Sequence, residues 1–305
     1  MLVTAKKLLV PARAKGYAVP ALNVNDLEMI KAVISAAEKM NSPVIIQTSE
    51  GAIEYAGIEY LAAMIRVAAK GKIPVAMHLD HGKDMKYVKM ALANGYTSVM
   101  FDGSALPYKQ NLKVTKEVVR LAHAKGASVE AEIGAIAGIE DFVSVEEKNA
   151  HLTNPEEAAM FAKESGCDSL AVAIGTMHGA FKFKGKTHLD IDRLKKIAKL
   201  VKLPIVLHGA SGVLEDVKEI AEHYGAKLGD ARGVLDVDIK AAIRQGVAKI
   251  NIDTDLRLAF TAGIREAISE LPKVIDPRKL LEPSTLLMRE VATRKMKLFG
   301  SAGRA

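Results

Sequence analysis

The sequence predicts an α/β fold in which eight parallel strands, each followed by a helix, close into a (β/α)8 TIM barrel. The chain has 305 residues, a length within the range of about 200 to 400 that such barrels occupy. Short apolar runs alternate with helical patterns along most of the chain, and eight such runs occur. Continuous apolar strands separated by amphipathic helices indicate a parallel sheet covered by helices, and eight such units favour a closed barrel over an open sheet.

Each predicted strand is short, apolar and bounded by polar or turn-forming residues. The strands are expected at residues 18–24, 44–48, 75–79, 98–101, 128–133, 169–174, 205–207 and 248–252. Asn25 and Asp26 follow the first strand as a helix cap, and Leu27, Ile30 and Ile34 then recur at helical spacing. The same pattern places further helices around residues 58–69, 85–93, 112–124, 155–165, 191–200, 214–223 and 256–268.

We expect one domain that spans residues 1–305, with residues 273–305 as a C-terminal extension. Prolines punctuate this extension before a helical run around residues 286–298, which is a candidate for docking on a neighbouring copy. A doubly wound sheet is the alternative, but that fold needs a glycine-rich turn after its first strand. The turn here, Asn23-Val24-Asn25, contains no glycine. The pattern therefore favours one barrel with a helical extension.

Composition excludes several classes of protein. Apolar residues make up 49% of the chain and charged residues 26%, which excludes a disordered or collagen-like chain. No apolar run approaches the ~20 residues that cross a bilayer, and the N-terminus lacks a signal-peptide pattern, so we expect a cytoplasmic protein that binds no membrane. Cys167 is the only cysteine, which excludes an intrachain disulfide and a cysteine-based zinc module.

The net charge of +7 is compatible with nucleic acid, with anionic metabolites or with solubility alone. Lysines are scattered over the predicted helix faces, aromatic residues make up 5% of the chain, and tryptophan is absent. The chain therefore lacks the basic and aromatic stripe on which bases stack. We expect no nucleic-acid partner and favour small anionic substrates.

Every predicted strand places a polar residue at its C-terminal end, where the chemistry of such barrels lies. These residues are Asn23, Ser49 with Glu50, Asp80 with His81, Asp102, Glu132, His178, His208, and Asn251 with Asp253. The closed sheet would bring all of them to one rim. The sequence therefore predicts an active site built from residues that are far apart along the chain.

Three histidines among these residues, His81, His178 and His208, are each followed by glycine. Three imidazoles suit a catalytic Zn²⁺ or a similar ion with one open position, and glycine lets the backbone approach a ligand closely. Each histidine alone could instead be a hydrogen-bonded residue at a buried strand end. Asp80 would face away from His81 unless the strand ends before it, as we expect, and it would then orient an imidazole or act as a general acid/base.

Two loops indicate recognition of a phosphate. Gly209-Ala210-Ser211-Gly212 follows the seventh strand, and Asn251-Ile252-Asp253-Thr254 opens a helix after the eighth. These are the loops that commonly bind phosphate in such barrels, although either motif alone is also typical of an ordinary turn or cap. Lys182 adds a cation shortly after His178, and the small-residue loop at residues 132–141 is a candidate lid.

Six segments that contain these residues occur in a fixed order. They are His78-Leu79-Asp80-His81-Gly82, Val129-Glu130-Ala131-Glu132-Ile133-Gly134, His178-Gly179-Ala180-Phe181-Lys182, His208-Gly209-Ala210-Ser211-Gly212, Asn251-Ile252-Asp253-Thr254-Asp255 and Asp276-Pro277-Arg278-Lys279. Together they resemble the class II, metal-dependent fructose-1,6-bisphosphate aldolases over nearly the whole chain. The resemblance implies a (β/α)8 barrel and a lyase that reversibly cleaves fructose 1,6-bisphosphate to dihydroxyacetone phosphate and glyceraldehyde 3-phosphate in glycolysis and gluconeogenesis.

The resemblance also implies roles for individual residues. The positions that match metal-binding residues, for Zn²⁺ or a substitute such as Co²⁺, are His81, His178, His208 and Glu132. Asp80 matches the residue that handles the proton of the C4 hydroxyl, and Glu140 matches the loop acid that exchanges a proton with the dihydroxyacetone phosphate carbon. A Lewis acid beside the former carbonyl would stabilise the negative charge of an enediolate without a Schiff-base lysine.

The positions that match substrate-binding residues lie around the sugar phosphate and a nearby monovalent cation, either K⁺, Na⁺ or NH₄⁺. They are Asn23, Ser49, Gly179, Lys182, Gly209, Ser211, Asn251, Asp253 and Thr254. Arg278 matches an arginine that reaches the far phosphate from a neighbouring subunit. The resemblance therefore implies a homodimer or a homotetramer.

Two other functions stay open at the level of the sequence. Tagatose-1,6-bisphosphate aldolases share these motifs and differ only in the stereochemistry at C4 of their substrate. A non-catalytic phosphosugar-binding protein could use the same barrel, but it would need the phosphate loops and not Asp80 together with the histidines.

Overall fold

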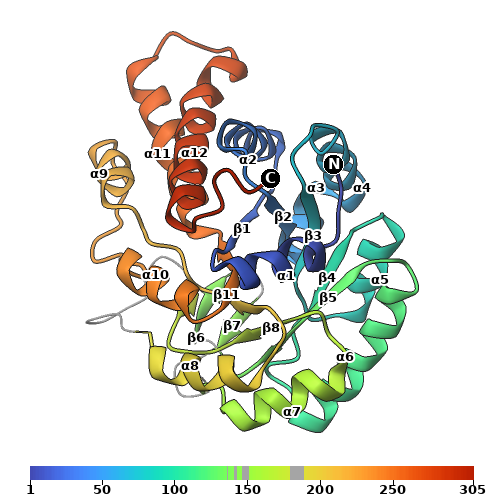
Figure 1. Ribbon diagram of the computed structural model, residues 1–305. Helices are drawn as coiled ribbons and strands as arrows, with labels where there is room; N and C mark the ends of the chain where they lie inside the picture. The colour runs from blue at the N-terminus through green and yellow to red at the C-terminus, as the bar shows by residue number, and fades with distance from the viewer. Residues whose placement is uncertain (136, 141–142, 146–150, 179–188) are drawn as a thin grey trace.

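A computed structural model of the chain describes residues 1–135, 137–140, 143–145, 151–178 and 189–305. Eight parallel strands form a closed barrel in the order β1-β11-β10-β8-β5-β4-β3-β2, with helices outside it (Figure 1). The barrel strands are β1 (Val19–Asn23), β2 (Val44–Thr48), β3 (Val75–Gly82), β4 (Ser98–Phe101), β5 (Ser128–Ile133), β8 (Ser169–Val172), β10 (Ile205–Leu207) and β11 (Val247–Ile252). The predicted barrel is confirmed.

Most helices cover the outer face of the barrel. In chain order the helices are α1 (Ala5–Lys15), α2 (Leu27–Met40), α3 (Glu50–Ala56), α4 (Ile58–Ala68), α5 (Met85–Ala93), α6 (Tyr108–His123), α7 (Pro155–Ser165), α8 (Ile191–Leu200), α9 (Glu215–His223), α10 (Asp236–Arg244), α11 (Thr254–Glu270) and α12 (Pro277–Leu298). By contrast, α1 packs on inward-facing strand residues and α12 packs on α11 and α2. Local capping begins several of them. The Asp26 carboxylate accepts a hydrogen bond from the Met29 amide at 2.8 Å at the start of α2, as the cap pattern predicts.

The helices α1, α3 and α10 were not predicted from the sequence. α1 contains Pro11, which normally argues against a helix interior, and its tertiary contacts override that preference. Its buried residues Leu8 and Leu9 pack with Val19 and Ile45 of the barrel strands in one apolar cluster. Burial of this apolar face against the strands stabilises the helix despite its proline.

A second, smaller sheet lies outside the barrel. It joins β6 (Ala137–Glu140), β7 (Val143–Val145) and β9 (Met177–His178), with β6 antiparallel to β7 and parallel to β9. The segment expected to be a loop at residues 132–141 therefore contains the end of β5 and the strand β6. The sixth barrel strand ends at Val172, earlier than predicted, because the chain leaves the barrel to reach β9.

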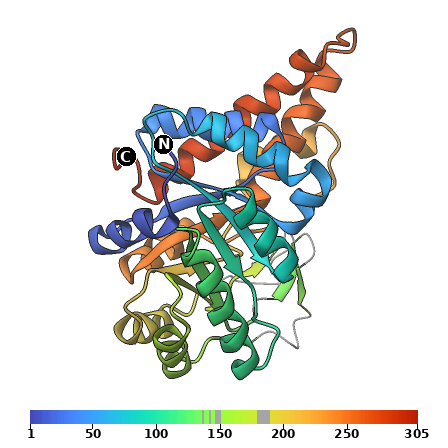
Figure 2. The same cartoon turned by 90° about the vertical axis from the view of Figure 1, so that its right-hand side faces the viewer.

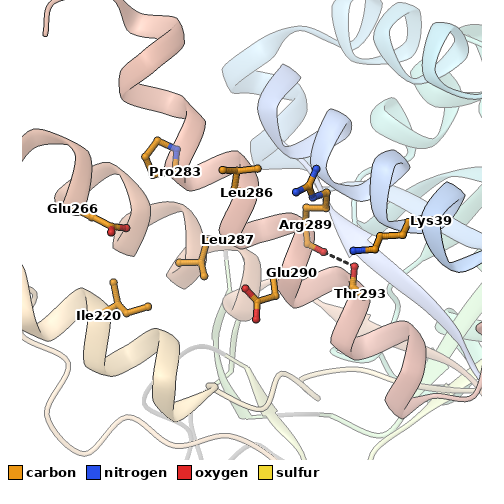
Figure 3. A pocket seen from close by; sticks show the side chains of 9 residues that line it. All are labelled: Lys39, Ile220, Glu266, Pro283, Leu286, Leu287, Arg289, Glu290 and Thr293. Atoms are coloured by element: carbon orange, nitrogen blue, oxygen red, sulfur yellow. Dashed lines mark hydrogen bonds between the residues drawn. The ribbon is translucent and has the colours of Figure 1, made fainter. Parts of the chain in front are cut away.

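The C-terminal extension is mostly one helix, α12, which begins nine residues earlier than the predicted run at residue 286. It packs along α11 and α2, and both views show the α11–α12 pair extending beyond the barrel (Figures 1 and 2). A pocket beside α12 is lined by residues of α2, α9, α11 and α12 (Figure 3). None of those residues belongs to a barrel strand, so this pocket is separate from the predicted rim. No helix among the described residues is long and apolar enough to span a bilayer.

Candidate active site

Asp80 and His81 both point into the barrel although they are adjacent on β3. The prediction that the strand ends at Leu79 is wrong, because β3 continues to Gly82. Its pairing with β4 shifts register between Leu79 and Gly82, and His81 has a positive φ of 47°. A bulge of this kind interrupts the alternation of faces along a strand. Two successive side chains can therefore contribute to one site.

His81 and His208 come together from opposite parts of the chain. Their ring centroids are 4.6 Å apart, and the rings pack edge to face. The Nδ1 of His81 donates to the Asp102 carboxylate at 2.9 Å. The Nε2 of His208 donates to Glu130 at 2.8 Å, which leaves Nδ1. Carboxylates thus select the tautomer of each imidazole, as they do for metal-binding histidines.

Glu132 completes a set of atoms that fits a divalent cation. Its Oε2 lies 3.3 Å from the Nδ1 of His208, and within the described part of the chain neither atom makes a hydrogen bond although both are buried. Asp80, His81 and His208 each offer one possible ligand atom, and these three atoms lie within 4.8 Å of one another. Buried polar atoms without partners are costly. A metal ion at this position would satisfy them, so the residues present fit the ion that the sequence predicts.

The electrostatics of the cluster favour a cation. Burial opposes the charged form of His81, but Asp80 and Asp102 outweigh burial and raise the pKa of His81 to about 10. Burial likewise opposes the charged form of His208, but Glu132 and Glu130 raise its pKa to about 9. These pKa values report an excess of negative charge around the rings. A ligand imidazole must be neutral, so a bound metal ion would replace these protons.

The Asp80 carboxylate is held by three amide side chains. Its Oδ2 accepts hydrogen bonds from Asn23 Nδ2 at 2.9 Å and from Gln47 Nε2 at 3.1 Å, and its Oδ1 accepts one from Asn251 Nδ2 at 2.9 Å. Burial opposes its charge, but the neighbouring His81 and Lys249 outweigh burial and hold the pKa of Asp80 below its ordinary value. The residue is therefore a fixed, ionised carboxylate beside the two imidazoles.

A charged network lies beneath the site at the centre of the barrel. The Lys249 ammonium donates to both oxygens of Glu130, at 2.8 and 3.0 Å, and lies 3.3 Å from His78 Nε2. Burial and the Lys249 charge lower the pKa of His78 to about 3, so this imidazole is neutral. Lys249 and Glu130 are both buried. The ammonium compensates the carboxylate that orients His208.

Glu130, Lys249 and Gln47 belong to the site although no role was predicted for them from the sequence. A signal for two of them was present, because Glu130 precedes Glu132 by two positions and Lys249 precedes Asn251 by two. Residues two apart on a strand face the same side, so an inward-facing Glu132 predicts an inward-facing Glu130. Charged residues in the middle of apolar strands mark the barrel interior in this case.

The two predicted phosphate loops lie next to each other, because β10 pairs with β11. Gly209 adopts a positive φ of 57°, and Ser211 is buried. Thr254 begins α11, so the N-terminus of that helix faces the same rim. Arg257 Nε donates to the Asp253 carboxylate at 2.8 Å. Backbone amides and a helix N-terminus gathered in this way can bind an anion.

Other predicted site residues have different positions. Ser49 lies at the rim after β2, and its Oγ accepts from the Ala52 amide at 3.2 Å as the cap of α3. Arg278 is the second residue of α12, with its side chain 89% exposed and paired with Asp276 at 2.8 Å. For His178 and Glu140 the structure describes only the backbone, on β9 and β6. Gly179 and Lys182 lie outside the described residues.

The fold and these side chains define a barrel enzyme with a metal-binding, acid/base site. The profile of the family described as "Fructose-bisphosphate aldolase class-II" matches residues 3–304. The chain is 51% identical to a fructose-bisphosphate aldolase of Thermus caldophilus and 44% identical to one of Helicobacter pylori strain J99, with 100% of each chain covered. The crystal structure of the YdjI aldolase of Escherichia coli K12 matches with a TM-score of 0.82 and 35% identity, again over 100% of both chains.

This chain belongs to the class II fructose-bisphosphate aldolase family. It is accordingly a lyase of the metal-dependent class. The independent geometric result, a cluster of imidazoles and carboxylates that could hold a metal ion, agrees with that membership.

Proposed function

We propose that this enzyme reversibly cleaves fructose 1,6-bisphosphate into dihydroxyacetone phosphate and glyceraldehyde 3-phosphate, with Zn²⁺ or Co²⁺ bound by His81, His178 and His208. The observation that carries the proposal is the buried Nδ1 of His208 and Oε2 of Glu132, which lie 3.3 Å apart and have no hydrogen bond among the described residues, beside the ionised Asp80. When bound, the metal supplies a Lewis acid that stabilises negative charge developing beside the ketone. Glu132 offers it a further oxygen at 3.3 Å from His208.

Asp80 is the proposed acid/base for the C4 hydroxyl. Its carboxylate is ionised and immobilised by Asn23, Gln47 and Asn251, so it is ready to accept a proton without reorganisation. Glu140 is the proposed acid that exchanges the proton on the dihydroxyacetone phosphate carbon. Its backbone lies on β6, and β6 pairs with the strand that carries His178.

The phosphate next to the ketone is proposed to bind the adjoining loops after β10 and β11. The residues concerned are Gly209, Ser211, Asn251, Asp253 and Thr254, together with Gly179 and Lys182, which follow His178 in the sequence. A monovalent cation, K⁺, Na⁺ or NH₄⁺, would share the site through oxygen ligands. Asn23 at the end of β1 and Ser49 directly after the neighbouring strand β2 would contact the sugar chain.

A homodimer or homotetramer is proposed because Arg278, which matches a phosphate-binding arginine, has an exposed side chain at the start of α12, on the α11–α12 pair that extends beyond the barrel (Figure 1). Ile275, just before the helix, is 93% exposed. A second copy could receive this end beside its own active site. Arg278→Ala is expected to raise KM for the bisphosphate by about tenfold, the effect of losing one charged phosphate contact. Unchanged KM in steady-state assays would remove Arg278 from the site.

The two competing functions are less well supported. The matched relatives are named fructose-bisphosphate aldolases, so the tagatose alternative is not favoured. Parallel turnover assays with both sugars test this choice, and equal or greater tagatose cleavage would contradict it. A purely binding protein would have no use for an ionised Asp80 held by three amides. A cytoplasmic location remains a prediction from the sequence.

Removal of the divalent metal ion is expected to abolish cleavage, and added Zn²⁺ or Co²⁺ is expected to restore it. The reason is that the described side chains of the site are carboxylates, imidazoles and amides. None of these groups can act as a Lewis acid towards the negative charge of an enediolate. Cleavage should be followed before and after treatment with a strong chelator, with a mock-dialysed sample as the control. Cleavage that survives complete removal of the metal ion, or a lysine adduct trapped by borohydride, would contradict a class II mechanism.

A further inference from the structure

The helix α12 carries one lysine into the protein interior. Lys295 is 2% exposed, and its ammonium lies 2.7 Å from the Asp255 carboxylate, which is also buried. Lysine is rarely buried without a partner, and a buried ion pair is weak evidence for stability because both charges lose their hydration. The pair therefore calls for a reason other than packing of the C-terminal extension.

Asp255 holds the loop that follows β10. Its Oδ2 accepts a hydrogen bond from the Gly212 amide at 2.9 Å, and its Oδ1 accepts one from the Val213 amide at 2.7 Å. Val213 has a positive φ of 50°, a conformation that a β-branched residue rarely adopts. The carboxylate thus fixes the backbone of a strained segment directly after Gly209 and Ser211.

The opposite side of this loop is also closely packed. The Val234 amide donates to the Ser211 carbonyl at 3.1 Å. A Cβ atom on Gly233 would lie 2.2 Å from the carbonyl carbon of Gly212, and one on Gly212 would lie 3.1 Å from the Lys295 ammonium. The loop consequently has little room to move between Gly233 and the Asp255–Lys295 pair.

We propose that Lys295 is a positioning residue for phosphate binding. Its ammonium allows the Asp255 carboxylate to hold the backbone of residues 209–213 without repelling the phosphate. The inference rests on the proposed phosphate role of Gly209 and Ser211. An uncompensated Asp255 would place a negative charge directly behind the site of a dianion, in an interior where screening is weak. The ammonium of Lys295 cancels that charge. The C-terminal helix thereby contributes to substrate affinity from outside the site.

The experiment compares Lys295→Met, which removes the charge and keeps a long side chain, with Lys297→Met on the exposed side of the same helix. Lys295→Met is expected to raise both KM for fructose 1,6-bisphosphate and the inhibition constant of inorganic phosphate by about tenfold. The kcat should change little, because the substitution weakens binding that the ground state and the transition state share. Bound metal should not change. Lys297→Met should match the wild type in all four measurements.

A double variant, D255N/K295M, removes both charges and guards against misfolding of the single variant. It is expected to bind inorganic phosphate within about threefold of the wild type, because replacement of a buried pair leaves no charge behind. Folded K295M with unchanged phosphate inhibition would overturn the inference. A folded double variant that binds phosphate tenfold or more weakly would also overturn it, and this comparison decides the matter if K295M does not fold.

Ser211→Ala separates failure of this inference from failure of the proposed phosphate site. If S211A weakens phosphate inhibition while K295M does not, the role of Lys295 is wrong and the site stands. If S211A leaves both KM and phosphate inhibition unchanged, the phosphate site itself is misplaced and the inference fails with it.

Discussion

Replacement of Asp80 with alanine is expected to lower turnover by about 10²- to 10⁴-fold, the usual contribution of a general acid/base. The carboxylate is ionised at neutral pH, since neighbouring positive groups hold its pKa below the ordinary value against the effect of burial. Three amides orient it, and none of them can accept a proton in its place. The measurement is kcat together with bound metal by elemental analysis.

Asp80→Asn is the matched variant, because it keeps the size of the side chain and loses the base. Both variants should retain the metal ion if Asp80 acts on the substrate. Asp80 also lies close enough to His81 and His208 to be a metal ligand. A loss of metal in both variants, or turnover near that of the wild type, would reassign Asp80 to holding the metal site together.

Replacement of Lys249 with methionine is expected to lower the free energy of unfolding by about 3 to 5 kcal/mol, the usual cost of removing one member of a buried ion pair. Lys249 donates to Glu130 with Nζ–O distances of 2.8 and 3.0 Å, both residues are buried, and His208 is a second partner of the same carboxylate at 2.8 Å. The Lys249 charge also helps to hold the pKa of Glu130 below its ordinary value against burial. Without it the carboxyl would tend to take up a proton.

A protonated Glu130 would accept the hydrogen bond from His208 poorly. Lys249→Met should therefore also bind zinc about 10- to 100-fold more weakly, which is the usual effect of disturbing the partner of a ligand histidine. Chelator competition measures the zinc affinity, and denaturant unfolding of the metal-free protein measures stability. The double variant E130Q/K249M should recover most of the stability, since it leaves no unpaired charge, but not the zinc affinity. Wild-type values for Lys249→Met in both measurements would show that the network has no such role.

The barrel could be predicted from the sequence because its strands are local features. Most strands are short apolar runs with a polar residue at or directly after their end, as in Val44–Thr48 and in Ser98–Phe101 before Asp102, and the structure places these two elements where the pattern indicates. α1 could not be predicted, because Pro11 argues against a helix and only the packing of Leu8 and Leu9 on the strands outweighs it. β6 was not predicted either: it is a run of only four residues, Ala137–Glu140, that contains a glycine, and of its two partners β7 is short and β9 is distant in sequence.

The sequence by itself determined which residues end the barrel strands, and therefore that Asp80, His81 and His208 are candidates for one site. Only the tertiary structure decided how these residues are held. Glu130 and His208 are 78 positions apart, Glu130 and Lys249 are 119 apart, and Asp80 and Asn251 are 171 apart. Closure of the barrel and docking of α12 bring such pairs within hydrogen-bond distance in a dry interior. A hydrophobic pattern reports which side of an element is buried, but it carries no information about which distant charge will lie opposite.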